Sequence, residues 1–404
     1  MNDIEGVLFS FKNRKELNEG VRHKMRPRFA VRMLMAALTI LCAVGQISCG
    51  GSSSSAPPAP QPIPAPAAGP KPFAPYIDTS LNPNLPQIQA SSSIKYFTLA
   101  FIVDGGGCSA NWDGATPVSS DSTYTGYINA IRAGGGDVVF SFGGAAGDNL
   151  PTQGAYQGSN DAPDLDLAYS NDCATASALT SALQTVINQY GANPANNTIY
   201  LDFDVEGNAV NSDAGNGPTR TRTDGVDSVD LRNQALTALV ANNPGITINV
   251  SYTMGVYETG GLPQDQISVL QNALDNSTPV AVMNIMTFDF GPDEAIAPGS
   301  YAPVVENLAN QTLTQLSEPP LSALGAQLGI TLMIGVNDSP GEVFGLSDAQ
   351  AVTAFATPNA DIVRLSFWSV GRDTGGCPGS DQDQNTCSGI EQFQWDFSHT
   401  CEAF

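Results

Sequence analysis

From Phe73 onward, eight β-like segments alternate with segments whose apolar residues recur at helical spacing. This alternation is typical of repeated βα units. Eight such units favour an α/β fold with a closed (β/α)8 TIM barrel over an open doubly wound sheet. We expect strands within Phe73–Asp78, Lys95–Asp104, Asp137–Gly144, Thr198–Gly207, Ile246–Met254, Ala281–Phe290, Thr331–Val336 and Ile362–Val370, and helices such as Ser122–Ala133, Ala176–Tyr190, Ser228–Ala241, Gln264–Asn272 and Asp348–Phe355.

Composition and charge narrow the classes of function. With 404 residues and 42% hydrophobic side chains, the chain is long enough for one catalytic-size domain, residues 73–404, plus appendages. Residues 1–49 hold eight Lys or Arg against four Asp or Glu, a net charge of +4. Because the whole chain has a net charge of −23, residues 50–404 have a net charge of −27. A body this acidic repels phosphate backbones, which argues against nucleic acid as a partner. The glycine clusters at 105–107 and 134–136 lack a dinucleotide fingerprint's strand-to-helix context, and we expect no cofactor.

The first 72 residues resemble an export signal followed by a linker. A basic stretch after Met25 precedes the apolar run 33–44, which is too short to span a bilayer, and then small residues up to Cys49. Cys49 is a candidate for lipidation, with plain cleavage nearby as the alternative. Residues 50–72 are rich in Gly, Ser, Pro and Ala and read as a spacer. We expect a secreted or envelope-anchored protein that touches membrane only through a lipidated Cys49.

The cysteines agree with export into an oxidising compartment. We expect disulfides between Cys108 and Cys173 and between Cys377 and Cys387, which leaves Cys401 unpaired. A zinc site is the competing interpretation, but the cysteine spacings do not fit one and the exported part has a single histidine, His399. The sequence therefore predicts no metal centre and argues against a mechanism that needs a catalytic histidine.

Three carboxylates recur at every second residue in the segment Ile-Tyr-Leu-Asp-Phe-Asp-Val-Glu-Gly, residues 199–207. On a strand, Asp202, Asp204 and Glu206 point to one face, about 6.6 Å apart at roughly 3.3 Å per residue. The apolar residues before Asp202 indicate that both faces are buried. Buried, crowded acids are costly and cluster at functional sites. The competing interpretations are a solvated strand face and a structural calcium site.

Other chemically distinctive residues fall at the ends of the expected strands, where barrel active sites lie. The third strand ends in Ser141, Gly143 and Gly144, the sixth ends with Met286, Phe288 and Asp289, and the eighth carries Trp368. Taken singly, the glycines fit a plain turn and the tryptophan fits a core position. Their coincidence at one rim favours a site.

Together these residues resemble glycoside hydrolase family 18, the chitinases and their relatives. The family signature has Asp-x-x-Asp-x-Asp-x-Glu on the fourth strand, Ser-x-Gly-Gly on the third, Met-x-Tyr-Asp on the sixth and Trp on the eighth. The similarity covers roughly residues 73–404, and the segments 333–338 and 367–373 look like the archaeal and bacterial chitinase A-like subgroup. Two positions depart from the pattern: Ile199 replaces the first Asp, and Phe288 replaces a Tyr that donates a hydrogen bond to the substrate acetamide.

The resemblance implies retaining, substrate-assisted hydrolysis of β-1,4-linked N-acetylglucosamine polymers such as chitin. Glu206 would be the general acid, Asp204 would turn toward the sugar's N–H, and Asp202 would share a proton with Asp204. Trp368 would form the floor under the sugar, and Asp289 would contact it or set the charge balance.

Two other functions stay open. One is cleavage of another N-acetylated glycan, as by an endo-β-N-acetylglucosaminidase or an enzyme acting on bacterial wall glycan. The other is non-catalytic sugar binding on the same barrel, which Phe288 keeps open and Glu206 argues against. Tyr76, Trp112 and Trp395 are candidates to extend the groove or to pack in the core. We expect a monomer whose partner is the glycan.

Overall fold

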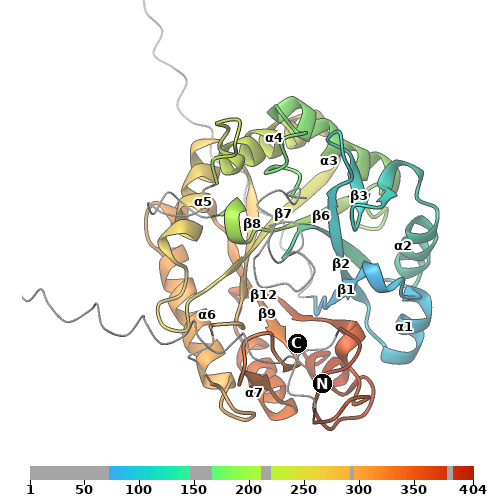
Figure 1. Ribbon diagram of the computed structural model, residues 1–404, viewed down its shortest axis with the longest axis vertical. Helices are drawn as coiled ribbons and strands as arrows, with labels where there is room; N and C mark the ends of the chain where they lie inside the picture. The colour runs from blue at the N-terminus through green and yellow to red at the C-terminus, as the bar shows by residue number, and fades with distance from the viewer. Residues whose placement is uncertain (1–71, 146–165, 211–219, 292–294, 380–384) are drawn as a thin grey trace, which may run out of the picture. The chain divides into compact units, whose positions relative to one another are not determined.

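The computed structural model describes residues 72–145, 166–210, 220–291, 295–379 and 385–404 (Figure 1). The predicted signal, Cys49 and almost all of the predicted linker lie outside these residues. Within the described ranges, no helix combines the length and apolar character needed to cross a membrane.

The core is a mainly parallel sheet, and the fold is mixed α/β (Figure 1). Each adjacent pair along the path β12-β9-β8-β7-β6-β5-β2-β1 is parallel. Just before β1, Phe73 forms a single parallel bridge with Leu365 of β12. These eight strands are β1 (Tyr76–Asp78), β2 (Tyr96–Asp104), β5 (Asp137–Gly143), β6 (Thr198–Asp204), β7 (Thr247–Gly255), β8 (Val280–Met286), β9 (Gln327–Met333) and β12 (Ile362–Trp368).

Two short additions flank this parallel path. Beyond β2, the strands β3 (Ala110–Trp112) and β4 (Thr116–Pro117) extend the sheet in antiparallel fashion. A separate two-stranded ribbon pairs β10 (Gly335–Val336) with β11 (Val343–Phe344).

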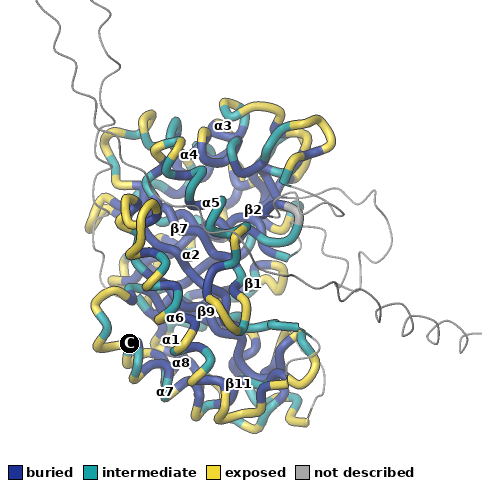
Figure 2. Tube along the Cα trace, turned by 90° about the vertical axis from the view of Figure 1, so that its left-hand side faces the viewer, coloured by how far each residue is buried: buried dark blue, intermediate teal, exposed yellow. Residues whose placement is uncertain are grey.

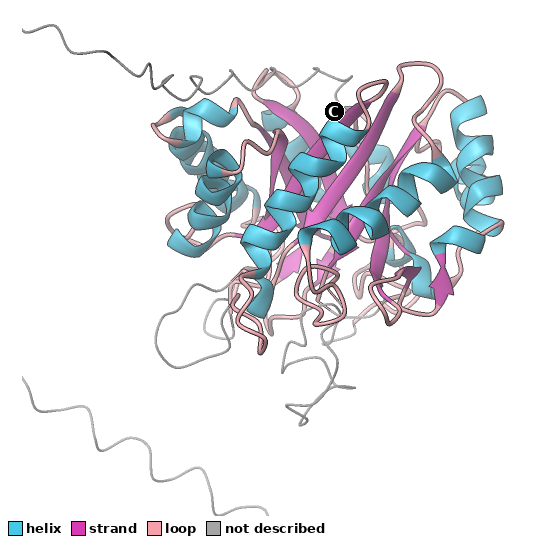
Figure 3. Cartoon of the chain, turned by 90° about the horizontal axis from the view of Figure 1, so that it is seen from above, coloured by secondary structure: helices cyan, strands magenta, loops and turns pink. Residues whose placement is uncertain are grey.

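The helices lie around the outside of the sheet, so one face of each strand packs against helices (Figures 1 and 3). They are α1 (Leu85–Ser92), α2 (Thr123–Ala133), α3 (Ala176–Tyr190), α4 (Ser228–Asn242), α5 (Gln264–Asp275), α6 (Ala302–Ser317), α7 (Leu346–Ala356) and α8 (Asp396–Cys401). Local capping fixes several of their starts. Thr175 accepts a hydrogen bond from the N–H of Ala178 at α3, and Asp227 accepts from Val229 and Asp230 at α4.

The eight expected strands are all present in the expected order, with shifted ends. The largest shifts are of four residues: β8 ends at Met286, before the expected end at Phe290, and β9 begins at Gln327, before the expected segment 331–336, and ends at Met333. Gly335, at φ +79°, lies in the left-handed region and starts β10 instead. The five named helices are also present. The segments that form α1, α6 and α8 were not named, although Pro303 marks the first turn of α6.

The inner face of the sheet is polar. Figure 2 shows the central strands mostly buried, and the outward residues of β5, β6 and β7, including Phe140, Leu201 and Val250, belong to the apolar core under the helices. Alternate residues on the opposite face are buried and polar, namely Ser141, Asp202, Ser251, Thr253, Asn284, Thr331, Arg364 and Ser366. This enclosed polar face positions the carboxylates described next.

Candidate active site

The three spaced carboxylates lie where β6 ends. Asp202 and Asp204 share one face of β6 and are 0% and 4% exposed, whereas Glu206, two residues beyond the strand, is only partly buried. On the opposite face, Phe203 stacks on Phe142 with ring centroids 5.0 Å apart. Both faces of the strand are therefore enclosed, and the alternative of a solvated strand face is wrong.

Asp202 is surrounded by hydroxyl groups. Its Oδ2 accepts hydrogen bonds from Tyr76 at 3.0 Å and Ser141 at 2.8 Å. Its Oδ1 accepts from Ser251 at 2.6 Å and Thr253 at 2.8 Å. A carboxylate offers about four lone-pair sites, so all of those on Asp202 are occupied.

Asp204 has a contrasting environment. Its Oδ1 is buried, and no described residue gives it a hydrogen bond. Burial raises the pKa of Asp204 well above its ordinary value, and the charges of Glu206 and Asp202 raise it further. No hydrogen bond joins Asp204 to Asp202 within the described contacts, so the expected sharing of a proton between them stays a prediction.

The pKa of Glu206 is raised to about 7, first by burial and then by the negative charge of Asp338. Asp338 is exposed and follows β10. In the structure, burial comes first and the charge that acts comes from another loop. A carboxyl with a pKa near neutrality retains a proton that it can donate.

Asp289 follows β8 in the left-handed region, at φ 55°. Its Oδ1 accepts from the N–H of Ser339 at 2.9 Å. Buried Glu342, which the sequence interpretation missed, accepts from the N–H groups of Asp289 and Phe290 and from the hydroxyl of Tyr301. Burial raises the pKa of Asp289 to about 7, and nearby Glu342 and Glu206 add to that rise.

The glycines after Ser141 permit close backbone contact. A Cβ on Gly143 would lie 2.3 Å from the carbonyl oxygen of Asp204, and Gly143 has φ +93°. The N–H of Gly144 donates to that same oxygen at 3.0 Å. These contacts are more specific than a plain turn requires, because they join the ends of β5 and β6 at the acids.

Aromatic rings form the rim beside the acids. Trp368 is partly exposed and stacks on Phe101, with centroids 5.7 Å apart and planes at 15°. Phe101 lies on β2 and was missed, because a single Phe in an apolar strand carries no distinguishing signal. Tyr76 is buried and lies 6.0 Å from the Trp368 ring, so it supports the site from below and does not extend a groove.

Trp112 does not extend a groove either. It is 2% exposed, and its Nε1 donates to the hydroxyl of Tyr190 at 2.7 Å within the apolar core. Trp395 packs partly buried against that core. At the end of β8, Met286 is buried and Phe288 is partly exposed.

The side chains behind Asp202 were also missed. Asn284 donates to Thr253 at 2.9 Å, and Arg364 donates to Ser251 at 2.8 Å. A usable signal was present, because polar residues recur at alternate positions in strands that are otherwise apolar.

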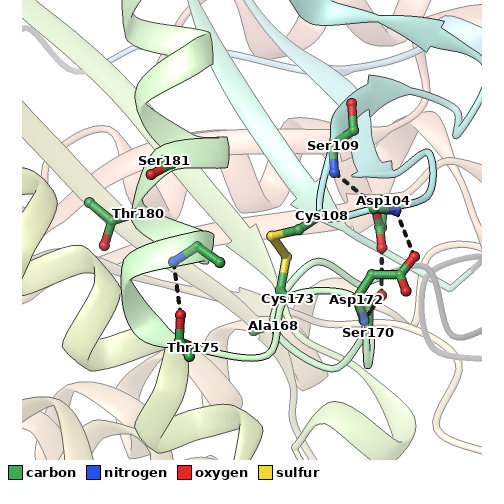
Figure 4. The surroundings of a disulfide bond; sticks show 12 residues. Asp104, Cys108, Ser109, Ala168, Ser170, Asp172, Cys173, Thr175, Thr180 and Ser181 are labelled. Carbon is green, nitrogen blue, oxygen red and sulfur yellow. Dashed lines mark hydrogen bonds between the residues drawn. A yellow bond between two sulfur atoms is a disulfide. The ribbon is translucent and has the colours of Figure 1, made fainter.

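The cysteine prediction is confirmed. Disulfides join Cys108 to Cys173 (Figure 4) and Cys377 to Cys387, while Cys401 is free and buried. In the ranges that the structure covers, no three His, Cys, Asp or Glu side chains gather as a metal site.

Comparisons with known proteins point in one direction. No family model matches the chain. It is 30% identical over 319 residues to a probable bifunctional chitinase/lysozyme of Escherichia coli strain K12, covering 75% of this chain and 31% of that protein. It is 29% identical over 316 residues to endochitinase 11 of Metarhizium anisopliae, covering 74% and 52%. The chain thus spans about a third of one relative and about half of the other.

A solved structure agrees with these relatives. The catalytic domain of a hyperthermophilic chitinase from Pyrococcus furiosus superposes with a TM-score of 0.61 and 27% identity, covering 82% of this chain and 95% of that domain.

Proposed function

Because this chain belongs to the chitinases of glycoside hydrolase family 18, we propose that it hydrolyses β-1,4-linked N-acetylglucosamine chains with retention of configuration. The observation that carries the proposal is the contrast among the three acids on and just after β6. Asp202 is saturated with hydrogen bonds, Asp204 has an unpartnered buried oxygen, and Glu206 has a pKa of about 7.

This contrast divides the chemistry among the acids. Glu206 donates its proton to the glycosidic oxygen as the bond from that oxygen to the anomeric carbon breaks. Asp204 accepts a hydrogen bond from the acetamide N–H of the sugar, which fills its empty position. The acetamide carbonyl oxygen then attacks the anomeric carbon and forms a cyclic oxazolinium. Ionised Glu206 next takes a proton from water. The water oxygen bonds to the anomeric carbon from the face that the leaving group first occupied, and the bond between that carbon and the acetamide oxygen breaks.

The rim fits the same substrate. Trp368, stacked on Phe101, offers an apolar face beside the acids, suited to the apolar face of a pyranose ring. Asp289 would contact the sugar from the end of β8. We also propose that the eight parallel strands close as a (β/α)8 barrel, supported by the Phe73–Leu365 bridge between the residues before β1 and β12.

A second substrate is favoured by one specific observation. The Escherichia coli relative is named as a lysozyme as well as a chitinase, so bacterial wall glycan is the alternative polymer to test. Both polymers carry the 2-acetamido group that the mechanism uses. Endo-β-N-acetylglucosaminidase action and non-catalytic sugar binding are the remaining outcomes of that comparison.

We further propose that residues 73–404 act as a monomer outside the cytoplasm, after the predicted signal and linker. Two disulfides support an oxidising compartment. The mature N-terminus decides the form of export. A mass spectrum with a diacylglyceryl group on Cys49 establishes a lipoprotein, whereas a free N-terminus near residue 50 establishes plain cleavage.

The test of the mechanism follows chitotriose hydrolysis by the purified full chain with proton NMR. Retention predicts that the β anomer of the new reducing end appears first and then mutarotates. Initial release of the α anomer contradicts substrate assistance. Purified wall glycan in a parallel sample decides between the two polymers.

A further inference from the structure

A buried arginine lies beneath the acids. Arg364 belongs to β12, is 4% exposed, and is the one Lys or Arg in any strand of the described ranges. Its Nη1 donates to Ser251 at 2.8 Å and lies 3.6 Å from Oδ1 of Asp202. The side chain therefore reaches from β12 to the facing strands β6 and β7.

The arginine fixes the direction of the hydrogen bonds around Asp202. A guanidinium can only donate, so the hydroxyl oxygen of Ser251 accepts from Arg364 and its one proton points to Asp202, 2.6 Å away. The amide of Asn284 has the same effect on Thr253, which then donates to Asp202 at 2.8 Å. Both hydroxyls on Oδ1 are thereby committed as donors.

We propose that Arg364 is a positioning residue: through Ser251 it fixes Asp202 as an ionised acceptor, so that the proton of the Asp202–Asp204 pair resides on Asp204. This inference rests on the proposed function and deepens it. Charge balance agrees, because one cation and one carboxylate leave the enclosed polar face neutral when Asp204 is protonated. An unpaired buried carboxylate would be costly.

The titratable and charged groups that face Asp202 are few. Those that interact with it are Tyr76 on β1, Asp204 on β6 and Arg364 on β12. Tyr200 interacts with Arg364, and Glu206 interacts with Asp204. From the neighbouring strands β5 and β7, the contacts to Asp202 are the hydroxyls of Ser141, Ser251 and Thr253. Arg364 is the single cation in this group.

The first experiment locates the proton without turnover. The full chain is labelled with carbon-13 at the aspartate carboxyls, and the signals of the pair are assigned with Asp202→Asn and Asp204→Asn. We expect the Asp202 signal to show an ionised carboxylate and the Asp204 signal a neutral acid at pH 6. A neutral Asp202, or a proton averaged over the pair, overturns the inference even if the enzyme is active.

The second experiment uses pH profiles of chitotriose hydrolysis. Arg364→Met removes the cation and should move the acidic limb of kcat upward by about one pH unit, because the carboxylate loses its nearest positive charge. In Arg364→Lys, which keeps the charge, the acidic limb should lie close to its position in the parent enzyme. Ser251→Ala interrupts the relay and should shift the limb less than Arg364→Met does.

Arg132→Met is the matched control. Arg132 also pairs with an aspartate, 2.9 Å from Asp137, and its side chain is 7% exposed, but it lies on α2 away from the acids. The Arg132→Met variant should have a lower melting temperature than the parent, and the acidic limb of its kcat profile should not move. If Arg364→Met behaves like this control, Arg364 is merely structural and the inference fails. If the parent enzyme releases nothing, the proposed function fails while the NMR result still decides the inference.

Discussion

The ring of Phe101 occupies the space that a side chain at Gly144 would need, since a Cβ on Gly144 would lie 2.5 Å from Cε2 of that ring. The same ring stacks against Trp368 and also contacts the ring of Tyr76. The end of β5 therefore supports the proposed sugar platform through Phe101. The absence of a side chain at Gly144 sets the position of Trp368 indirectly.

Gly144→Ala should displace this platform. Gly135→Ala is its control, because both glycines have similar positive φ, +77° and +81°, but nothing lies within 4 Å of a Cβ on Gly135. Both variants pay for backbone strain, and the extra contact at Gly144 should destabilise that variant by a further 1–3 kcal/mol or so. We expect KM for chitotriose to rise about tenfold in Gly144→Ala alone, by the scale of a contact of about 1.4 kcal/mol. If Gly144→Ala and Gly135→Ala change KM in steady-state kinetics and the free energy of unfolding in denaturant by equal amounts, the predicted contact with Phe101 is contradicted.

Asp338→Asn should move the basic limb of activity to lower pH. The proposed acid, Glu206, must be protonated, so activity should fall as pH rises through about 7. Asp338 raises that pKa, and its removal should lower the limb by roughly half a pH unit, with less effect at high salt because Asp338 is exposed. Asp361→Asn removes another exposed carboxylate, at the start of β12, and should leave the limb unchanged. An upward shift in Asp338→Asn is incompatible with this assignment.

Asp204→Asn should stabilise the protein at high pH. Because the folded-state pKa of Asp204 is raised, the folded protein binds this proton more tightly than the unfolded chain does. The bound proton on Asp204 therefore stabilises the parent protein at low pH, and this stabilisation is lost as pH rises above the ordinary carboxyl range. The melting temperature of Asp204→Asn should exceed the parent's at pH 8 by on the order of 2 °C and match it at pH 5.

Asp202→Asn provides the contrast at the same depth. An amide there places a donor against hydroxyls that already donate, so this variant should melt lower than the parent at both pH values. Stabilisation by Asp202→Asn, or no pH dependence in Asp204→Asn, contradicts the distinction between the two acids.

Phe288→Tyr should raise kcat. The phenyl ring of Phe288 cannot donate a hydrogen bond to the acetamide oxygen that must be oriented for attack, and a hydroxyl at that position can. A gain of about tenfold is expected, the scale of one added hydrogen bond. Phe290→Tyr is the comparison two residues along the chain, where no gain is expected. An unchanged or lower kcat in Phe288→Tyr means that another group already serves the acetamide.

The parallel strands were predictable because each is a short apolar run bounded by turn residues. Ala176–Tyr190 was recognisable as a helix because its apolar residues recur at helical spacing. Helix α6 was harder, because Asn and Gln interrupt its apolar positions. The end of β9 depended on the positive φ of Gly335, which the sequence alone does not specify.

Within the site, residues that form a motif were predictable and their supports were not. Asp202, Asp204 and Glu206 stand out because acids at alternate strand positions are rare. Arg364 and Glu342 come from distant parts of the chain, and their roles depend on which strands face each other. For Trp112 the sequence left a groove position and a core position open, and the structure places it in the core.

The most direct test of the account compares the parent chain with Glu206→Gln on a chromogenic chitotriose glycoside, with binding to insoluble chitin measured in parallel. We predict release by the parent, a loss of at least about a hundredfold in the variant, and unchanged binding, because glutamine keeps the shape of the acid and cannot give up a proton. Binding by both proteins with release by neither contradicts the central claim and identifies a sugar-binding protein.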